Sequence, residues 1–222
     1  MEATPAKPNL APTGWALLGM LSGGDELSGY DIKKWANWVL RFFYQSPAYS
    51  QIYSELKKME EIGYVTSRVE NDGGARNRRL YKITAVGEQA IATWTSASPY
   101  DPPMLKHSVL LRVTFGHLSD PAKLRELLQE HIAYCDRMQQ HAGIEARWTE
   151  GEPAWAYAKI ALKWAERYYA SERELALTLL KDIDEAEAAF GKALSRDGAS
   201  IPWPDREYWY EIEQRIKKEE SD

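Results

Sequence analysis

The sequence contains a single cysteine, Cys135, so no disulfide can form within the chain and a cysteine-rich zinc site is excluded. No apolar run approaches the roughly 18 residues that a membrane-spanning helix needs. Residues 1–12 contain no apolar stretch of the kind found in signal peptides. We therefore expect a cytoplasmic protein.

The sequence also lacks the motifs of the common enzyme classes. It contains no Gly-rich phosphate loop, no nucleophile elbow and no paired-acid motif. None of the four histidines (His107, His117, His131 and His141) stands at the two-histidine spacing typical of zinc ligands. We therefore predict that the protein is not an enzyme and binds no cofactor and no metal.

An excess of positive charge is missing as well, since the net charge at pH 7 is −5. The charge is nevertheless divided unevenly. Residues 1–99 carry 11 Lys and Arg against 10 Asp and Glu, whereas residues 100–222 carry 17 against 23. The positive charges of the first part gather at Lys57–Lys58 and Arg76–Lys82. A locally basic surface attracts phosphate and an acidic one repels it, so we expect any nucleic acid to contact residues 1–99.

The pattern of residues 13–96 predicts a winged helix-turn-helix. After a Pro- and Ala-rich tail, 1–12, apolar spacing and turn residues indicate three helices, a two-stranded hairpin and a fourth helix. We place the helices at 15–21, 29–42, 48–62 and 85–94, and the strands at 64–70 and 78–84. In the third helix Ile52, Leu56 and Met59 form one apolar stripe.

The remainder of the chain is predicted to be helical. The segment 97–103 holds three prolines between residues 99 and 103 and reads as a linker. Helices are expected at 105–115, 120–147 and 154–194, within a domain spanning 104–198, and a C-terminal extension, 199–222, contains a helix at 207–217. The fold class is thus mainly α with a small β-hairpin. The long helix at 154–194 needs a partner for its apolar residues, which predicts a homodimer through Ile160, Trp164, Tyr168, Leu175, Leu179 and Ile183.

Three segments resemble the PadR-like transcriptional regulators. These are SGYDIKKW at Ser28–Trp35, SQIYSELKKMEEIGYV at Ser50–Val65 and RRLYKITAVGEQAI at Arg78–Ile91. The resemblance covers about residues 14–95, and the segment Ala158–Glu187 is similar to the long dimerisation helix of the larger PadR subgroup. The tail from Ile201 matches nothing that we can place. The resemblance implies a homodimer that binds an inverted-repeat operator, usually as a repressor, and several members of the family sense small aromatic compounds.

The recognition helix of a winged helix enters the major groove, and other elements contact the phosphates. On that geometry Ser50, Gln51 and Ser54 are expected to contact bases, and Lys57 and Lys58 to contact phosphates. Tyr53 either contacts DNA or packs inward, and the wing arginines either follow the DNA or form a solvated hairpin tip. The predicted DNA-binding residues are Ser28, Gly29, Tyr30, Tyr49, Ser50, Gln51, Tyr53, Ser54, Lys57, Lys58, Arg76, Arg78 and Arg79.

Nine tryptophans are many for a chain of this length. Packing explains most of them, but four are also candidates for an aromatic effector pocket at the dimer interface, namely Trp15, Trp38, Trp148 and Trp155. Two alternatives stay open at this point. One is a regulator without an effector, and the other is a winged-helix module that binds a protein partner and no DNA.

Overall fold

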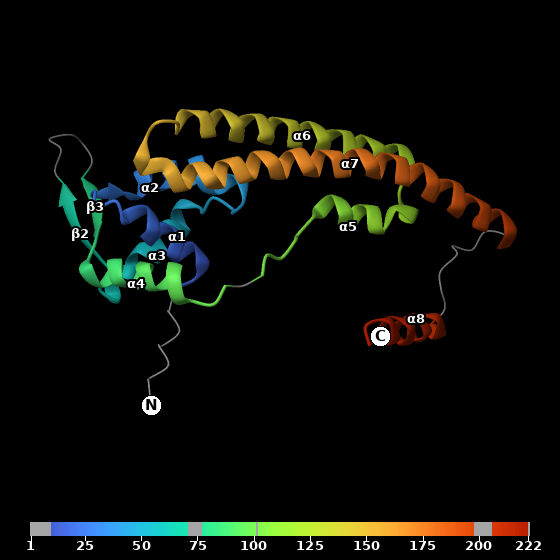
Figure 1. Cartoon of the computed structure of the whole chain (residues 1–222), viewed down its shortest axis with the longest axis horizontal. Coiled ribbons are helices and arrows are strands. Elements are labelled where there is room, and N and C mark those ends of the chain that lie inside the picture. The colour runs from blue at the N-terminus through green and yellow to red at the C-terminus, as the bar shows by residue number, and fades with distance from the viewer. Residues whose placement is uncertain (1–9, 71–76, 101, 198–205, 222) are drawn as a thin grey trace. The chain divides into compact units, whose positions relative to one another are not determined.

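The computed structural model describes residues 10–70, 77–100, 102–197 and 206–221, excluding the side chains of 193–197 and 206. The chain divides into two compact units (Figure 1). The first comprises Met1–Leu105 and Gln140–Glu166, and the second comprises Lys106–Gln139 and Arg167–Asp222. The segment Gln140–Glu166 therefore belongs with the winged helix, whereas the prediction included it in the helical domain at 104–198.

Most of the first unit follows the predicted order of helices and strands. Its elements are α1 (Pro12–Leu21), β1 (Leu27–Ser28), α2 (Gly29–Val39), η1 (Leu40–Phe42), α3 (Tyr49–Glu61), β2 (Val65–Glu70), β3 (Arg78–Ile83) and α4 (Ala85–Ala97). Three boundaries differ from prediction by three residues, and the others agree to within one residue. The helix expected over 29–42 ends at Val39 and continues as the 3-10 turn η1, α4 runs three residues further than expected, and α1 begins before Trp15 because Pro12 occupies its first turn.

The sheet has three antiparallel strands in the order β1–β3–β2. Val65 pairs with Ile83 and Glu70 with Arg78, which gives the predicted hairpin, while β1 adds Leu27 beside Tyr81. Strand β1 was not predicted, because two residues are too few to show an alternating pattern. The NDGG turn expected at 71–74 lies outside the described residues.

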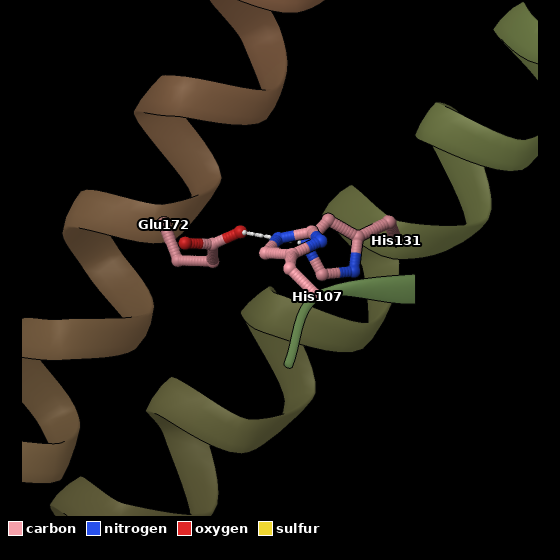
Figure 2. A group of neighbouring side chains, drawn as sticks. All are labelled: His107, His131 and Glu172. Atoms are coloured by element: carbon pink, nitrogen blue, oxygen red, sulfur yellow. Dashed lines mark hydrogen bonds and ion pairs between the residues drawn. The ribbon is translucent and has the colours of Figure 1, made fainter. Parts of the chain in front are cut away.

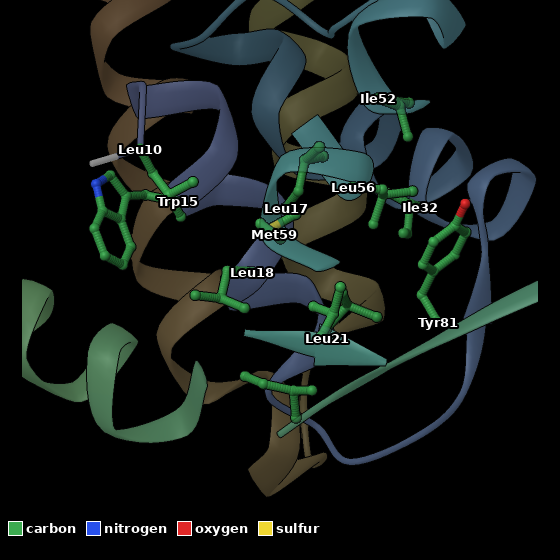
Figure 3. Packing of buried hydrophobic residues seen from close by; sticks show 12 residues of the cluster. Leu10, Trp15, Leu17, Leu18, Leu21, Ile32, Ile52, Leu56, Met59 and Tyr81 are labelled. Atoms are coloured by element: carbon green, nitrogen blue, oxygen red, sulfur yellow. The ribbon is translucent and has the colours of Figure 1, made fainter. Parts of the chain in front are cut away.

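The core of the first unit lies between the helices and the sheet (Figure 3). Ile52, Leu56 and Met59 of α3 are completely buried there, in agreement with the predicted stripe. Leu10 also packs into this core, although it falls within the tail predicted for residues 1–12. Trp15 is buried, and its ring stacks on that of Trp94 with 5.5 Å between centroids. The burial of these side chains is the main stabilisation of the winged helix.

The start of α4 is held tightly against Tyr64, the residue that precedes β2. Thr84 caps α4 by accepting a hydrogen bond from the amide of Gly87, and the Thr84 amide donates to the carbonyl of Tyr64. Gly87 is buried, and a Cβ added to it would lie only 2.2 Å from the Tyr64 carbonyl oxygen. A glycine is therefore required at this position by close backbone approach.

Two long helices contribute to both units. They are α6 (Pro121–Trp148) and α7 (Ala156–Asp197), separated by the short turn η3 (Pro153–Trp155). In the first unit, Arg41 forms an ion pair with Glu145 of α6, and the ring of Trp155 packs against Trp35 and Trp38. These contacts explain why Gln140–Glu166 clusters with the winged helix.

The second unit is helical, as predicted. It contains α5 (Ser108–Thr114), the 3-10 turn η2 (Gly116–Leu118), parts of α6 and α7, and α8 (Arg206–Glu219). Its core consists of Val109, Leu124, Leu128, Ala176 and Ile183. Helix α5 begins at Ser108, three residues later than expected, because His107 caps it through the amide of Leu110. Among the described residues, no helix is both long and apolar enough to span a membrane.

Candidate nucleic-acid interface

One face of α3 is polar and open to solvent. Ser50, Gln51, Ser54, Lys57 and Lys58 are all exposed, opposite the buried apolar stripe of the same helix. Tyr49 and Tyr53 are also exposed, by 45% and 47% respectively. The helix therefore presents hydroxyl, amide and ammonium groups to solvent on one face.

Two residues of this face have a structural role in addition to their exposure. Gln51 accepts a hydrogen bond from the amide of Ala48 through Oε1 at 2.8 Å, so its side chain caps the start of α3. The ring of Tyr53 covers Gly29, where an added Cβ would lie 2.7 Å from ring atoms. Tyr53 thus packs against Gly29 on one side and is open to solvent on the other, and its contact with DNA stays a prediction.

The N-terminus of α2 is closed by a reciprocal cap. The amide of Asp31 donates to Ser28 Oγ at 3.3 Å, and the amide and hydroxyl of Ser28 donate to Asp31 Oδ2 at 2.9 and 2.5 Å. Burial acts to raise the pKa of Asp31, but the hydrogen bonds from Ser28 and the charge of Arg78 outweigh it and lower this pKa. Ser28 and Gly29 are buried, so of the three residues predicted here Tyr30 presents an exposed side chain.

The predicted cations differ in how strongly they are engaged within the chain. Lys57 has a side chain that is 78% exposed and lies 3.8 Å from Glu61, whereas Lys58 donates to the buried Glu55 at 2.7 Å. On the wing, Arg79 is exposed and interacts only with the uncharged hydroxyl of Tyr81 among the contacts described, whereas Arg78 is exposed but lies 3.4 Å from the carboxylate of Asp31. Arg76 lies outside the described residues. Lys57 and Arg79 are therefore the cations best placed to contact phosphate.

Arg68 lies on β2 of the wing and is not among the predicted DNA-binding residues. Its guanidinium donates to Glu26 and Glu70, and these hydrogen bonds raise its pKa further above its ordinary value. Glu26 precedes β1, so this ion pair connects β1 to β2 across the sheet. Because its charge is already balanced by two carboxylates, Arg68 is poorly suited to neutralise DNA phosphates.

The four tryptophans predicted to form a pocket do not lie together. Trp38 and Trp155 are in contact, with ring centroids 4.9 Å apart, and Trp35 joins them at 5.0 Å from Trp155. Trp15 instead belongs to the core of the winged helix, and Trp148 is 82% exposed. The prediction of one pocket formed by these four tryptophans is therefore wrong. Trp35, Trp38 and Trp155 form a cluster of three, and Trp15 points into the core because it lies on the buried face of α1.

The six residues predicted for dimerisation fall into two groups. Ile160, Trp164 and Leu175 are exposed, and Tyr168 is half-buried. Ile183 is instead buried in the core of the second unit, with Leu179 packed beside it. The last two predicted residues, Leu179 and Ile183, are therefore covered within the chain. The side chains of Ile160, Trp164 and Leu175 are exposed on α7.

Comparison with known proteins agrees with this architecture. Residues 17–93 match the model of the transcriptional regulator PadR-like family, which covers α3, the sheet and most of α4. The chain carries a PadR-like domain. The negative transcriptional regulator PadR of Bacillus subtilis is 36% identical over 118 residues, or 53% of this chain. That alignment spans 64% of the relative, which is less than two thirds of its length.

Solved structures extend the likeness beyond the PadR-like domain. A crystal structure of Bacillus subtilis PadR in complex with operator DNA matches with a TM-score of 0.68 and 24% identity, covering 78% of this chain and 99% of that one. Another, of the same protein in complex with p-coumaric acid, gives a TM-score of 0.61 at 24% identity, covering 77% and 98%. The predicted fold class, a winged helix followed by a helical domain, is confirmed.

Proposed function

We propose that this protein is a transcriptional regulator whose PadR-like domain binds a specific operator in double-stranded DNA. The observation that carries the proposal is the exposed polar face of α3, in which Ser50, Gln51 and Ser54 precede the cations Lys57 and Lys58. In a winged helix this element enters the major groove, where amide and hydroxyl groups read base edges and lysines contact phosphates. The protein would act in the cytoplasm as a repressor at an inverted repeat.

The decisive experiment measures binding of the purified full chain to its own upstream DNA at two salt concentrations. We expect saturable binding that prefers this DNA over unrelated DNA and weakens steeply with salt, because each phosphate contact releases counterions. For Lys57→Ala/Lys58→Ala, the slope of log Kd against log salt should decrease by about two. Lys57→Ala alone should decrease it by about one, and it leaves the contact between Lys58 and Glu55 intact.

A matched control is Lys163→Ala/Lys181→Ala, which removes two exposed lysines from α7 and so changes the net charge equally. We expect the salt slope of this control to equal that of the wild type. A folded protein that binds no upstream fragment, and that captures a protein partner instead, would favour the protein-interaction module over the regulator.

We propose that two copies of the chain associate through the exposed apolar residues of α7. Ile160, Trp164 and Leu175 leave large apolar side chains in contact with solvent on one helix, which is costly unless a partner covers them. Light scattering should give twice the mass of one chain for the wild type. Leu175→Asp should shift the protein towards the monomer, whereas Ala188→Asp, which adds the same charge at an exposed position of α7, should not.

We propose further that a small aromatic compound acts as an effector and binds at the cluster of Trp35, Trp38 and Trp155. The support is that the ring centroids of Trp35 and Trp38 lie 5.0 and 4.9 Å from the ring centroid of Trp155. Tryptophan rings offer large and rigid apolar surfaces. Adding p-coumaric acid, which the similar Bacillus protein binds, should weaken operator binding in the assay above. An unchanged Kd together with unchanged tryptophan fluorescence would instead indicate a regulator without this effector.

A further inference from the structure

Three titratable side chains meet within the second unit, far from one another in the sequence. His107 stands just before α5, His131 lies on α6 and Glu172 lies on α7. Both imidazoles point to the same carboxylate oxygen (Figure 2), with Nε2 of His107 at 2.6 Å and Nε2 of His131 at 2.9 Å from Glu172 Oε1. No sequence motif indicates this cluster, because the three residues come from separate parts of the chain.

The cluster is largely shielded from solvent. The side chains of His107, His131 and Glu172 are 11%, 16% and 12% exposed, and their candidate ligand atoms all lie within 4.8 Å of one another. Burial acts to raise the pKa of Glu172, but hydrogen bonds from the two histidines outweigh it and lower this pKa. Two imidazoles and an anionic carboxylate are thus held together by α6, α7 and the residue that precedes α5.

We propose that His107, His131 and Glu172 form a binding site for one Zn²⁺ ion. Imidazole nitrogen and carboxylate oxygen are the ligands that zinc accepts in sites with three protein ligands, where water takes the fourth position. A nitrogen-rich set favours Zn²⁺ over Mg²⁺ and Ca²⁺, which take oxygen ligands almost exclusively. The ion would join the segment preceding α5 to α6 and α7.

The distances are close to those that the coordinated ion requires. Ligand atoms about 2.0–2.1 Å from a tetrahedral zinc ion lie about 3.3 Å from each other. The two nitrogen–oxygen distances in the cluster are 2.6 and 2.9 Å, so the side chains need to separate by only about half an ångström to admit the ion.

Zinc binding would exchange one set of contacts for another at His107. Its Nδ1 accepts the amide hydrogen of Leu110, so in the neutral ring the proton lies on Nε2 and is donated to Glu172. Coordination through Nε2 moves that proton to Nδ1, which can then no longer cap α5. We therefore expect the Leu110 amide to lose its hydrogen bond when the ion binds, and to exchange faster with solvent.

Cys135 is a neighbour of the cluster and is not counted among its ligands. Its Sγ lies 3.7 Å from His131 Nε2, but it is not part of the group whose ligand atoms lie mutually within 4.8 Å. The site therefore consists of nitrogen and oxygen ligands, and a Co²⁺ complex should lack thiolate charge-transfer absorption.

The test is calorimetric titration of the full chain, without an affinity tag and after removal of metals, with ZnCl₂ in the absence of DNA. We expect one Zn²⁺ per chain and a higher Tm with zinc present, since an ion that binds the folded state stabilises it. Glu172→Gln retains an oxygen that accepts the two histidine hydrogen bonds, which preserves the fold, but it removes the anionic ligand. Its Kd for zinc should rise at least about tenfold, and that of His131→Ala should rise similarly.

His141→Ala is the matched control, because His141 is an exposed histidine on α6. Its Kd for zinc and its rise in Tm should equal those of the wild type. The proposal is overturned if the folded wild type takes up no zinc, or if Glu172→Gln and His131→Ala bind zinc as the wild type does. An equal rise in Tm with MgCl₂, or thiolate absorption in the Co²⁺ complex, would also contradict the assigned ligands. None of these results depends on DNA binding.

Discussion

Replacing Gly87 with alanine is expected to lower the free energy of unfolding of the winged helix by about 3 kcal/mol. The new methyl group would meet the carbonyl oxygen of Tyr64 at 2.2 Å and Cγ1 of Ile83 at 2.9 Å. Ile83 can adjust by a side-chain rotation, but the Tyr64 carbonyl is backbone and accepts the amide of Thr84. Relief of the clash therefore requires α4 to move away from Tyr64, which breaks the contacts made by Thr84.

Thermal and urea unfolding, followed by tryptophan fluorescence, would measure this loss. Gly191→Ala is the matched control, because Gly191 also lies in a helix and an added Cβ there meets no atom within 4 Å. Its free energy of unfolding should remain unchanged or rise by up to about 1 kcal/mol, since alanine is the better helix former. Equal stability of Gly87→Ala and the wild type would show that α4 is not fixed against the Tyr64 carbonyl.

The second large effect is expected on DNA specificity when Gln51 is replaced by alanine. If Gln51 pairs with an adenine edge, its loss should reduce the preference for operator over unrelated DNA by about 1–3 kcal/mol. Binding to unrelated DNA should remain almost unchanged, because that binding depends on phosphate contacts. Lys57→Ala should show the opposite pattern, weakening both complexes to a similar degree and leaving their ratio unchanged.

Gln51 also caps α3, so a variant that separates capping from base recognition is needed. Gln51→Glu retains an oxygen that can accept the Ala48 amide, while it removes the amide donor that an adenine contact requires. We expect this variant to fold as stably as the wild type and to lose the preference for the operator. Retention of the full preference in both variants at position 51 would assign base recognition to other residues of α3.

The elements of the winged helix could be predicted from the sequence because their signals are local. The stripe of Ile52, Leu56 and Met59 follows the helical period, Ser28 and Thr84 cap helices as their residue types suggest, and the hairpin follows from two β-rich runs. Each of these signals depends on residues within a few positions of one another. The boundaries of α2 and α5 depend instead on particular contacts, and there the predictions differ from the structure by several residues.

The candidate sites could be predicted less completely, because they depend on pairs of residues distant in the sequence. Arg68 is neutralised by Glu26, which precedes it by 42 residues, and the charge pattern alone counts it as one more cation near the wing. Trp15 and Trp155 are both tryptophans, and tertiary packing alone decides that Trp15 lies in the core and Trp155 beside Trp38. The grouping of His107, His131 and Glu172 is likewise a property of the fold.

The burial of Cys135 makes the second unit open to a simple kinetic measurement. The thiol is fully buried, and its pKa of about 11 leaves very little reactive thiolate at neutral pH. A colourless disulfide reagent that releases a coloured product can therefore reach this sulfur only when the surrounding helices separate. Since the chain has no other cysteine, the rate of colour release measures the rate at which the helical unit opens. This measurement does not depend on the fluorescence of the tryptophans in the winged helix.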